Sequence, residues 1–199
     1  MYVTDIVRLD KKKSKIVCDE AVFALYLGEI RRLGIEVGTC ISEELYSEIF
    51  DEILYKRARE RALHLIEVMD RTEYQIRQKL SEGYYPADII ERVIAFLFKY
   101  GYIDDIQYAK KYMEYSINSK SKRRISDDLL RKGIKREIIN TVLVSNESYE
   151  KEQIIKILEK KKYNEVSNNF KEKNRVIAYL LRHGYEYDLI LESINIYMK

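Results

Sequence analysis

Three stretches of this sequence share one pattern: IRQKLSEG at residues 76–83, SDDLLRKG at residues 126–133 and IAYLLRHG at residues 177–184. Each ends in leucine, two polar residues and glycine, and each is followed by a short connector and a second apolar segment with helical spacing. A glycine at such a place suits the left-handed C-terminal cap of a helix, where a Cβ atom costs free energy. The pattern therefore predicts three helix–glycine–helix units.

The spacing of these units indicates a repeat protein. The three final glycines are 50 and 51 residues apart, which leaves room for three helices in each unit and is typical of a helical array. We expect a mainly α fold of tandem three-helix repeats in an elongated, curved array, with repeat 1 at residues 57–101, repeat 2 at residues 102–147 and repeat 3 at residues 148–199. An ordinary helical bundle is the less favoured alternative, since three matching glycines are hard to explain by chance.

Local signals mark where individual helices begin and end. Thr72, followed three residues later by Gln75, predicts a capping box at a helix start. Pro86 is expected at the first helical position, where its missing N–H does no harm. Gly101 is expected to close the third helix of repeat 1, and Asp104 to cap the first helix of repeat 2.

Residues 1–56 differ from the repeats. Short β-branched and aromatic stretches at residues 3–9, 15–19 and 22–27 predict a small antiparallel sheet, which must pack on something to be stable. Ser42, followed by two glutamates, predicts the start of a lead-in helix. This segment is therefore expected to be an N-terminal sheet with one helix leading into the repeats.

Composition narrows the class of protein. The chain has 199 residues, 46% hydrophobic and 35% charged, with one proline and seven glycines, which disfavours collagen-like and many-turned all-β folds. Two cysteines, Cys18 and Cys40, cannot make a disulfide scaffold. No apolar run approaches the ~18 residues of a membrane helix, and Asp5, Arg8 and Asp10 stand where a signal peptide is apolar. We expect a cytoplasmic protein that does not enter a membrane.

The sequence lacks the residue patterns of catalysis. His64 and His183 are the only histidines, and neither they nor the two cysteines have the paired spacing of metal ligands. No glycine-rich phosphate loop is present. We therefore expect no catalytic residue, no metal and no cofactor, and a protein that binds rather than catalyses.

Positive charge is concentrated in one short segment. Residues 118–136 contain eight cationic and two acidic side chains, whereas the formal net charge of the whole chain is only +3. Such a cluster is either a solvated helix face or a surface that attracts a polyanion. The candidate partner- or DNA-binding residues are Lys120, Lys122, Arg123, Arg124, Arg131, Lys132, Lys135 and Arg136.

Part of the sequence resembles the RecX family. GYIDD at residues 101–105, an aromatic–alanine pair at residues 108–109, the basic stretch KRRI at residues 122–125 and LRKGI at residues 130–134 follow the order of that family's pattern. The resemblance covers residues 57–145 well, with Ile103 in place of the usual leucine and Tyr108 in place of phenylalanine. The family motif is carried by Gly101, Tyr102, Asp104, Asp105 and Gly133.

The resemblance implies a cytoplasmic bacterial modulator of the RecA recombinase, built from tandem three-helix repeats. Family members bind RecA and its filament on single-stranded DNA and usually lower its recombinase and ATPase activity. On this view the basic segment faces DNA or an acidic surface of RecA. Asp104 belongs to the motif, although its position favours helix capping over a functional role.

Two other functions remain open. The helix–glycine–helix units would also suit a direct DNA-binding protein of the helix-turn-helix kind. The basic segment lacks a clear base-reading face, so such binding would be salt-sensitive and indifferent to sequence. A purely structural adaptor would leave the basic segment without a role.

Overall fold

The computed structural model describes residues 1–144, 149–166 and 169–198. The chain forms two compact units, Met1–Asp104 and Asp105–Lys199. The expected start of repeat 3 at residue 148 lies outside the described residues.

The first unit begins with a three-stranded antiparallel sheet in the order β1 (Val3–Arg8), β2 (Lys13–Cys18) and β3 (Val22–Tyr26). The expected sheet is thus confirmed. The third strand ends one residue earlier than expected, because the Glu29 carboxylate accepts a hydrogen bond from the Tyr26 N–H (2.7 Å) and starts helix α1 (Leu27–Arg32).

A long helical stretch leads from the sheet into repeat 1. Helix α2 (Glu43–Ser47) continues as a π-helical segment, η1 (Glu48–Tyr55), and then as α3 (Lys56–Val68). Ser42 caps α2 as expected, since its hydroxyl accepts from the Leu45 N–H at 3.3 Å. The π-helix was not foreseen; it buries Phe50, whose ring meets that of Phe23 in the sheet at 5.2 Å.

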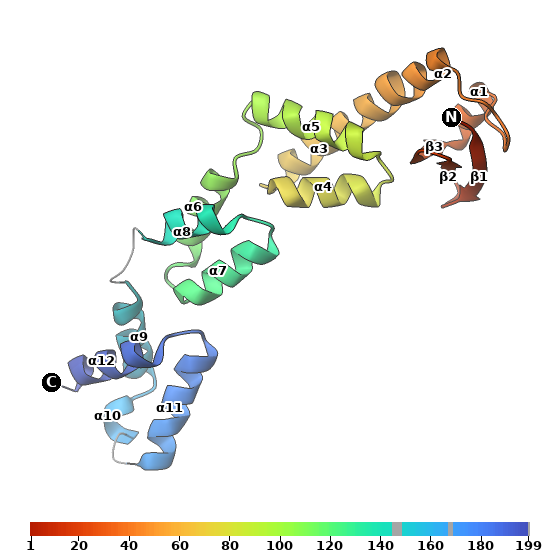
Figure 1. The fold of residues 1–199 in the computed structure, drawn as a ribbon. Helices are drawn as coiled ribbons and strands as arrows, with labels where there is room; N and C mark the ends of the chain where they lie inside the picture. The colour runs from red at the N-terminus through yellow and green to blue at the C-terminus, as the bar shows by residue number, and fades with distance from the viewer. Residues whose placement is uncertain (145–148, 167–168, 199) are drawn as a thin grey trace. The chain divides into compact units, whose positions relative to one another are not determined.

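Repeat 1 consists of α3, α4 (Glu73–Glu82) and α5 (Ala87–Lys99) (Figure 1). The Thr72–Gln75 capping box is confirmed. The expectation for Pro86 is wrong by one residue: it is the N-cap of α5, with an extended ψ of 154°. Gly101 follows the end of α5 with a φ of +69°, as expected for a helix-terminating glycine.

One hydrophobic core joins the sheet to repeat 1. Ile16 and Phe23 of the sheet, Leu54 of η1, and Leu80 and Leu97 of repeat 1 are all fully buried in it. The sheet is therefore stabilised by the helices on which it packs, as a three-stranded sheet requires.

Repeats 2 and 3 make up the second unit. Repeat 2 contains α6 (Asp105–Ser116), α7 (Lys122–Arg131) and α8 (Arg136–Val144). Repeat 3 contains α9 (Tyr149–Lys160), α11 (Phe170–Arg182) and α12 (Tyr187–Tyr197), with one additional short helix, α10 (Tyr163–Val166). Each of these two repeats has its own hydrophobic core, which includes the fully buried Leu129 in repeat 2 and Leu180 in repeat 3.

The predicted glycine caps are confirmed in repeats 2 and 3. Gly133 has a φ of +82° and Gly184 a φ of +87°. In each case the next N–H bonds back to a leucine carbonyl in the last turn of the helix, at 3.1 Å for Ile134 and 3.3 Å for Tyr185. This backbone is a Schellman motif, which satisfies carbonyl groups at the helix end.

The same prediction is wrong for Gly83 in repeat 1. Gly83 has a φ of −85°, and Tyr84 takes the left-handed conformation with a φ of +60°. The reason is that α4 ends at Glu82 and the Tyr85 N–H bonds back to Leu80, which places the turn one residue later. The missing side chain of Gly83 instead leaves room for the Tyr85 ring, since a Cβ at position 83 would lie 3.0 Å from that ring.

Candidate functional site

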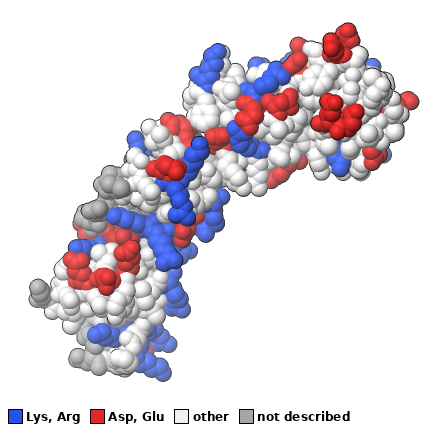
Figure 2. Space-filling model, viewed as in Figure 1, with Lys and Arg blue, Asp and Glu red and all other residues white. Residues whose placement is uncertain are grey.

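The basic segment, residues 118–136, lies entirely in repeat 2. It begins in the loop before α7, includes all of α7, and ends at the first residue of α8. Figure 2 shows a band of lysine and arginine side chains crossing one face of the second unit near α7 and the end of α11.

Two of the eight candidate cations stabilise repeat 2 itself. The Lys120 ammonium donates to the Asp128 carboxylate at 2.7 Å and to the Tyr112 hydroxyl at 2.8 Å. These hydrogen bonds raise the pKa of Lys120. The Lys132 ammonium lies 5.7 Å and 5.4 Å from the ring centres of Tyr108 and Tyr112. Both cations therefore hold α7 against α6 within the repeat.

Asp128 is the anionic centre of this network. Burial alone raises the pKa of its carboxyl, but hydrogen bonds from Lys120 and Tyr112 and the nearby charge of Arg131 reverse that effect and lower the pKa. Arg131 forms an ion pair with the same carboxylate while its side chain stays largely exposed. Arg131 is therefore positioned by Asp128.

Three other candidates lie around the ends of α7. The Lys122 ammonium stands 5.9 Å from the ring centre of Tyr149 in repeat 3. Lys135 and Arg136 are exposed at the start of α8. None of the three lines the cavity described next.

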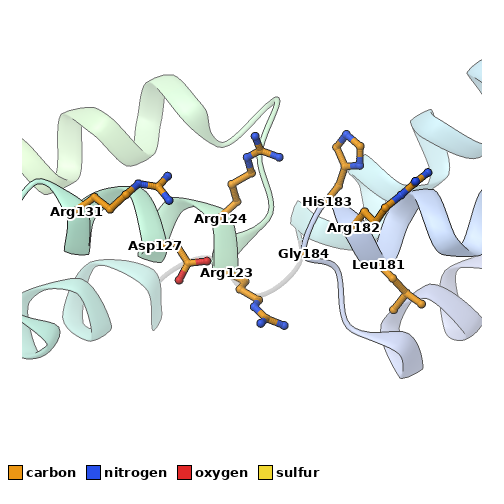
Figure 3. A pocket seen from close by; sticks show the side chains of 8 residues that line it. All are labelled: Arg123, Arg124, Asp127, Arg131, Leu181, Arg182, His183 and Gly184. Atoms are coloured by element: carbon orange, nitrogen blue, oxygen red, sulfur yellow. The ribbon is translucent and has the colours of Figure 1, made fainter.

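The remaining candidates, Arg123, Arg124 and Arg131, line a cavity of about 340 Å³ between α7 and the C-terminal end of α11. Figure 3 shows their side chains on one side of this cavity, with Arg182 and His183 on the other. The described residues that line it are Arg123, Arg124, Asp127, Arg131, Leu181, Arg182, His183 and Gly184.

Arg182 and His183 were not among the predicted site residues. A signal for them exists in the sequence, because they precede Gly184 as Arg131 and Lys132 precede Gly133. That alignment does not reveal that the end of α11 lies against the start of α7.

Ser121 joins the two repeats. Its buried hydroxyl donates to the His183 carbonyl oxygen at 2.7 Å and accepts from the Arg124 N–H at 3.3 Å. It therefore caps α7 and holds the end of α11 at the same time. The contact is tight, since a Cβ on Gly184 would lie 2.7 Å from the Ser121 oxygen.

A second contact between the repeats comes from α9. The Glu150 carboxylate accepts a hydrogen bond from the Lys122 N–H at the start of α7, at 2.8 Å. Glu150 is buried, and burial raises the pKa of its carboxyl. Within repeat 3, the Tyr185 hydroxyl, whose pKa burial raises to about 12, donates to the Gln153 side-chain oxygen at 2.6 Å.

The cavity carries a strong excess of positive charge. Among the described residues, four arginines line it and one acidic side chain does, that of Asp127. Within the described ranges, Arg123, Arg124 and Arg182 form no ion pair with a carboxylate. Guanidinium groups bind planar or tetrahedral oxyanions through paired N–H donors, so the cavity is suited to an anionic group.

The residues that carry the family motif lie mostly elsewhere. Gly101 and Tyr102 follow α5, and the Tyr102 ring stacks on Phe96 at 6.0 Å. Asp104 and Asp105 stand at the start of α6, where capping by Asp104 stays a prediction. Gly133 ends α7, and none of the five lines the cavity.

In the part of the chain that the structure describes, no group of three or more histidine, cysteine, aspartate or glutamate side chains is placed to hold a metal ion. Cys18 is buried and Cys40 exposed, and both are free thiols. Among the same residues, the helices are too short or too polar to cross a bilayer.

Comparison with protein families gives three matches along the chain. Residues 58–97 match the model of the first three-helix domain of RecX, residues 104–143 match the second, and residues 148–194 match the third.

Individual relatives give the same result. The chain is 34% identical to the regulatory protein RecX of Clostridium acetobutylicum, over 97% of this chain and 94% of the relative. It is 32% identical to the same protein of Caldanaerobacter subterraneus subsp. tengcongensis, over 98% and 100%.

Two solved structures share the fold. A crystal structure of regulatory protein RecX has a TM-score of 0.64 at 22% identity and covers 96% of this chain and 98% of its own. That of RecX from Lactobacillus salivarius has a TM-score of 0.67 at 24% identity, over 72% of this chain and 96% of its own.

Proposed function

Because this chain belongs to the RecX family, we propose that it is a non-enzymatic regulator that binds the RecA recombinase and its filament on single-stranded DNA and lowers recombinase and ATPase activity. The observation that carries this proposal is the similarity to regulatory RecX proteins along nearly the whole chain. The proposed setting is the bacterial cytoplasm, in DNA repair, recombination and the SOS response.

The basic segment supports a polyanionic partner. Arg123 and Arg124 are exposed at the start of α7, and Lys135 and Arg136 are exposed at the start of α8. Lys120 and Lys132 are engaged within repeat 2, as described above. We therefore assign partner contact to the exposed arginines first and a supporting role to the two lysines.

The direct test is single-stranded-DNA-dependent ATP hydrolysis by RecA with this protein titrated in. We expect the rate to fall at amounts near or below one molecule per RecA protomer, because a regulator of a filament acts on many protomers at once. A rise in the rate would make the protein an activator. No change, with DNA still bound in the absence of RecA, would favour the alternative of a sequence-indifferent DNA-binding protein.

The contribution of the basic segment is tested in the same assay. Replacing Lys122, Arg123 and Arg124 together by glutamate is expected to weaken the effect on RecA and its dependence on salt. The matched control replaces Lys156, Lys160 and Lys171, three exposed lysines of repeat 3, in the same way. Equal losses in the two variants would remove a specific role for the basic segment.

A further inference from the structure

We propose that the cavity between α7 and the end of α11 binds the phosphate groups of a single-stranded nucleic acid, and that it is assembled only while Ser121 and Gly184 hold repeats 2 and 3 together. The inference deepens the proposed function and rests on it for the choice of nucleic acid. It assigns binding roles to Arg182 and His183, in addition to the arginines of α7.

The charge of the cavity selects the chemical class of the ligand. Four arginines from two helices line one space, and Asp127 supplies the one carboxylate among the described lining residues. Among the described residues no carboxylate neutralises Arg123, Arg124 or Arg182. An acidic side chain would satisfy one guanidinium, whereas consecutive phosphates of one strand can satisfy several.

The shape and lining of the cavity favour the sugar–phosphate backbone over the bases. A volume of about 340 Å³ lies within the range of ligand pockets and exceeds the space that a single small ion needs. Among the lining residues that the structure describes, Leu181 is the one apolar side chain, and none is a tyrosine or phenylalanine. Bases bind single-strand proteins by stacking on aromatic rings. The one aromatic ring of the described lining, that of His183, is already stacked on Tyr179 at 4.0 Å between ring centres, so the cavity favours contacts to phosphates over stacking of bases.

Two of the first N–H groups of α7 already have acceptors. Ser121 accepts from the Arg124 N–H, and Glu150 accepts from the Lys122 N–H. The Ser121 hydroxyl also binds the His183 carbonyl oxygen, which would otherwise add partial negative charge at the end of α11. The arginine side chains are therefore the main donors available to a ligand.

The two walls of the cavity come from different repeats. Arg123, Arg124 and Arg131 belong to α7, while Arg182 and His183 belong to the end of α11. Ser121 and Gly184 set the distance between these walls, because a Cβ on Gly184 would contact the Ser121 oxygen at 2.7 Å. A change that separates the repeats without altering any charge is thus expected to weaken binding.

The experiment measures fluorescence anisotropy of a 5′-labelled oligo(dT) with the purified whole chain and no RecA. Arg182→Glu is expected to weaken the affinity about tenfold, as for loss of one charge-assisted hydrogen bond. The slope of log affinity against log salt is expected to fall by about 0.7, the value for one phosphate contact on a single strand.

The matched control is Lys171→Glu. It makes the same change of charge on the same helix, about 16 Å from Arg182 along the helix axis, at an exposed position. Its affinity is expected to stay within about twofold of the wild-type chain, because a distant surface charge is screened. If Arg182→Glu and Lys171→Glu lose equal affinity for oligo(dT), binding comes from the general positive charge of the surface, and the proposal is wrong.

An uncharged variant tests the assembly of the cavity. Gly184→Ala is expected to weaken oligo(dT) binding at least threefold with all charges kept. Arg182→Lys, which keeps the fold and the charge but loses the fork of donors, is expected to weaken binding by a similar factor. Wild-type affinity in both variants would overturn the proposal.

Other ligands give distinguishable outcomes. If ATP or inorganic phosphate binds the wild-type chain as tightly as oligo(dT), the site takes free phosphates and the proposal is wrong. If oligo(dT) does not bind, or if Arg182→Glu weakens only the effect on RecA ATP hydrolysis, the cavity contacts protein; the proposal then fails while the proposed function stands. If instead the wild-type chain does not change ATP hydrolysis by RecA, while Arg182→Glu still weakens oligo(dT) binding, only the proposed function is wrong.

Discussion

Helices α4 in repeat 1 and α11 in repeat 3 end with the same backbone conformation but with different residues in it. In both, an N–H beyond the helix bonds back to a leucine carbonyl, at 3.2 Å after α4 and 3.3 Å after α11. The residue with positive φ is Tyr84 in the first case and Gly184 in the second. A left-handed residue at a helix end therefore does not by itself require glycine in this protein.

The neighbours of the two helix ends explain the difference. A Cβ on Gly184 would collide with the Ser121 hydroxyl of the preceding repeat, whereas the ring of Tyr84 is partly exposed and lies 5.8 Å from the Lys15 ammonium. Gly184 is thus needed for the approach of two repeats as well as for its φ. The variants below separate these two contributions, in order of decreasing expected effect.

The largest effect is expected for Gly184→Ala. The left-handed conformation costs about 1–2 kcal/mol for a residue with a Cβ, and an overpacked contact costs roughly 1–3 kcal/mol more. We expect the free energy of unfolding of the second unit to fall by about 3 kcal/mol. Urea-dependent hydrogen exchange with mass spectrometry measures the two units separately.

The control for this variant is Gly101→Ala. Gly101 has a φ of +69°, and nothing lies within 4 Å of a Cβ placed on it. Gly101→Ala is expected to lower the free energy of unfolding by about 1 kcal/mol, from backbone strain alone. Equal losses at positions 101 and 184 would mean that the contact with Ser121 contributes nothing.

Ser121→Ala is expected to cost about 2 kcal/mol. Roughly 1 kcal/mol comes from the lost cap of α7, and about the same from the lost hydrogen bond to the His183 carbonyl. Ser42→Ala is a matched control, because both hydroxyls accept a cap hydrogen bond at 3.3 Å. If the two variants lose equal stability in denaturant unfolding, the bond between the repeats has no net value.

A smaller, pH-dependent effect is expected for Glu150→Gln. The pKa of Glu150 is raised by burial, so the folded chain keeps this proton at pH values where the unfolded chain has released it. The contribution of Glu150 to the free energy of unfolding is therefore fully present below the ordinary glutamate pKa of 4.5. It falls as the pH rises towards the pKa of Glu150 in the folded chain.

Glutamine keeps an oxygen that can accept from the Lys122 N–H, but it does not titrate. Glu150→Gln is therefore expected to unfold at higher urea than the wild-type chain at pH 7, with the difference disappearing below about pH 4.5. Glu152→Gln, on the exposed side of the same helix, should show no such trend. A wild-type advantage that grows with pH would contradict a raised pKa at Glu150.

The features that were predicted correctly depend on residues close together in the sequence. The capping residues Ser42 and Thr72 act on N–H groups three residues away, and Gly133 and Gly184 satisfy carbonyls of the preceding turn. Alternating burial in β2 likewise follows from its own side chains. Each of these signals involves only residues that are a few positions apart in the sequence. The sheet and the repeats could therefore be predicted from the sequence.

The features that were missed depend on tertiary contacts. After α4 the left-handed residue is Tyr84 rather than Gly83, and the centre of its ring lies 5.8 Å from the ammonium of Lys15 in the sheet. Arg182 and His183 join the arginines of α7 through a hydrogen bond that spans 62 residues. Lys120 could not be separated from the exposed cations by sequence, because Asp128 and Tyr112 meet it only in the folded repeat.

The smallest effect is expected at the other helix end, for Tyr84→Gly. Glycine removes backbone strain of about 1–2 kcal/mol but adds about 0.5–1 kcal/mol of chain entropy and loses the contact of the ring with Lys15. We expect a net gain of no more than about 0.5 kcal/mol in the unfolding free energy of the first unit. Tyr84→Ala also loses the ring but keeps the strain, so it should be about 1 kcal/mol less stable than Tyr84→Gly. If the alanine and glycine variants were equally stable, residue 84 would not carry the strain of a left-handed conformation. The backbone comparison between Tyr84 and Gly184 would then be wrong.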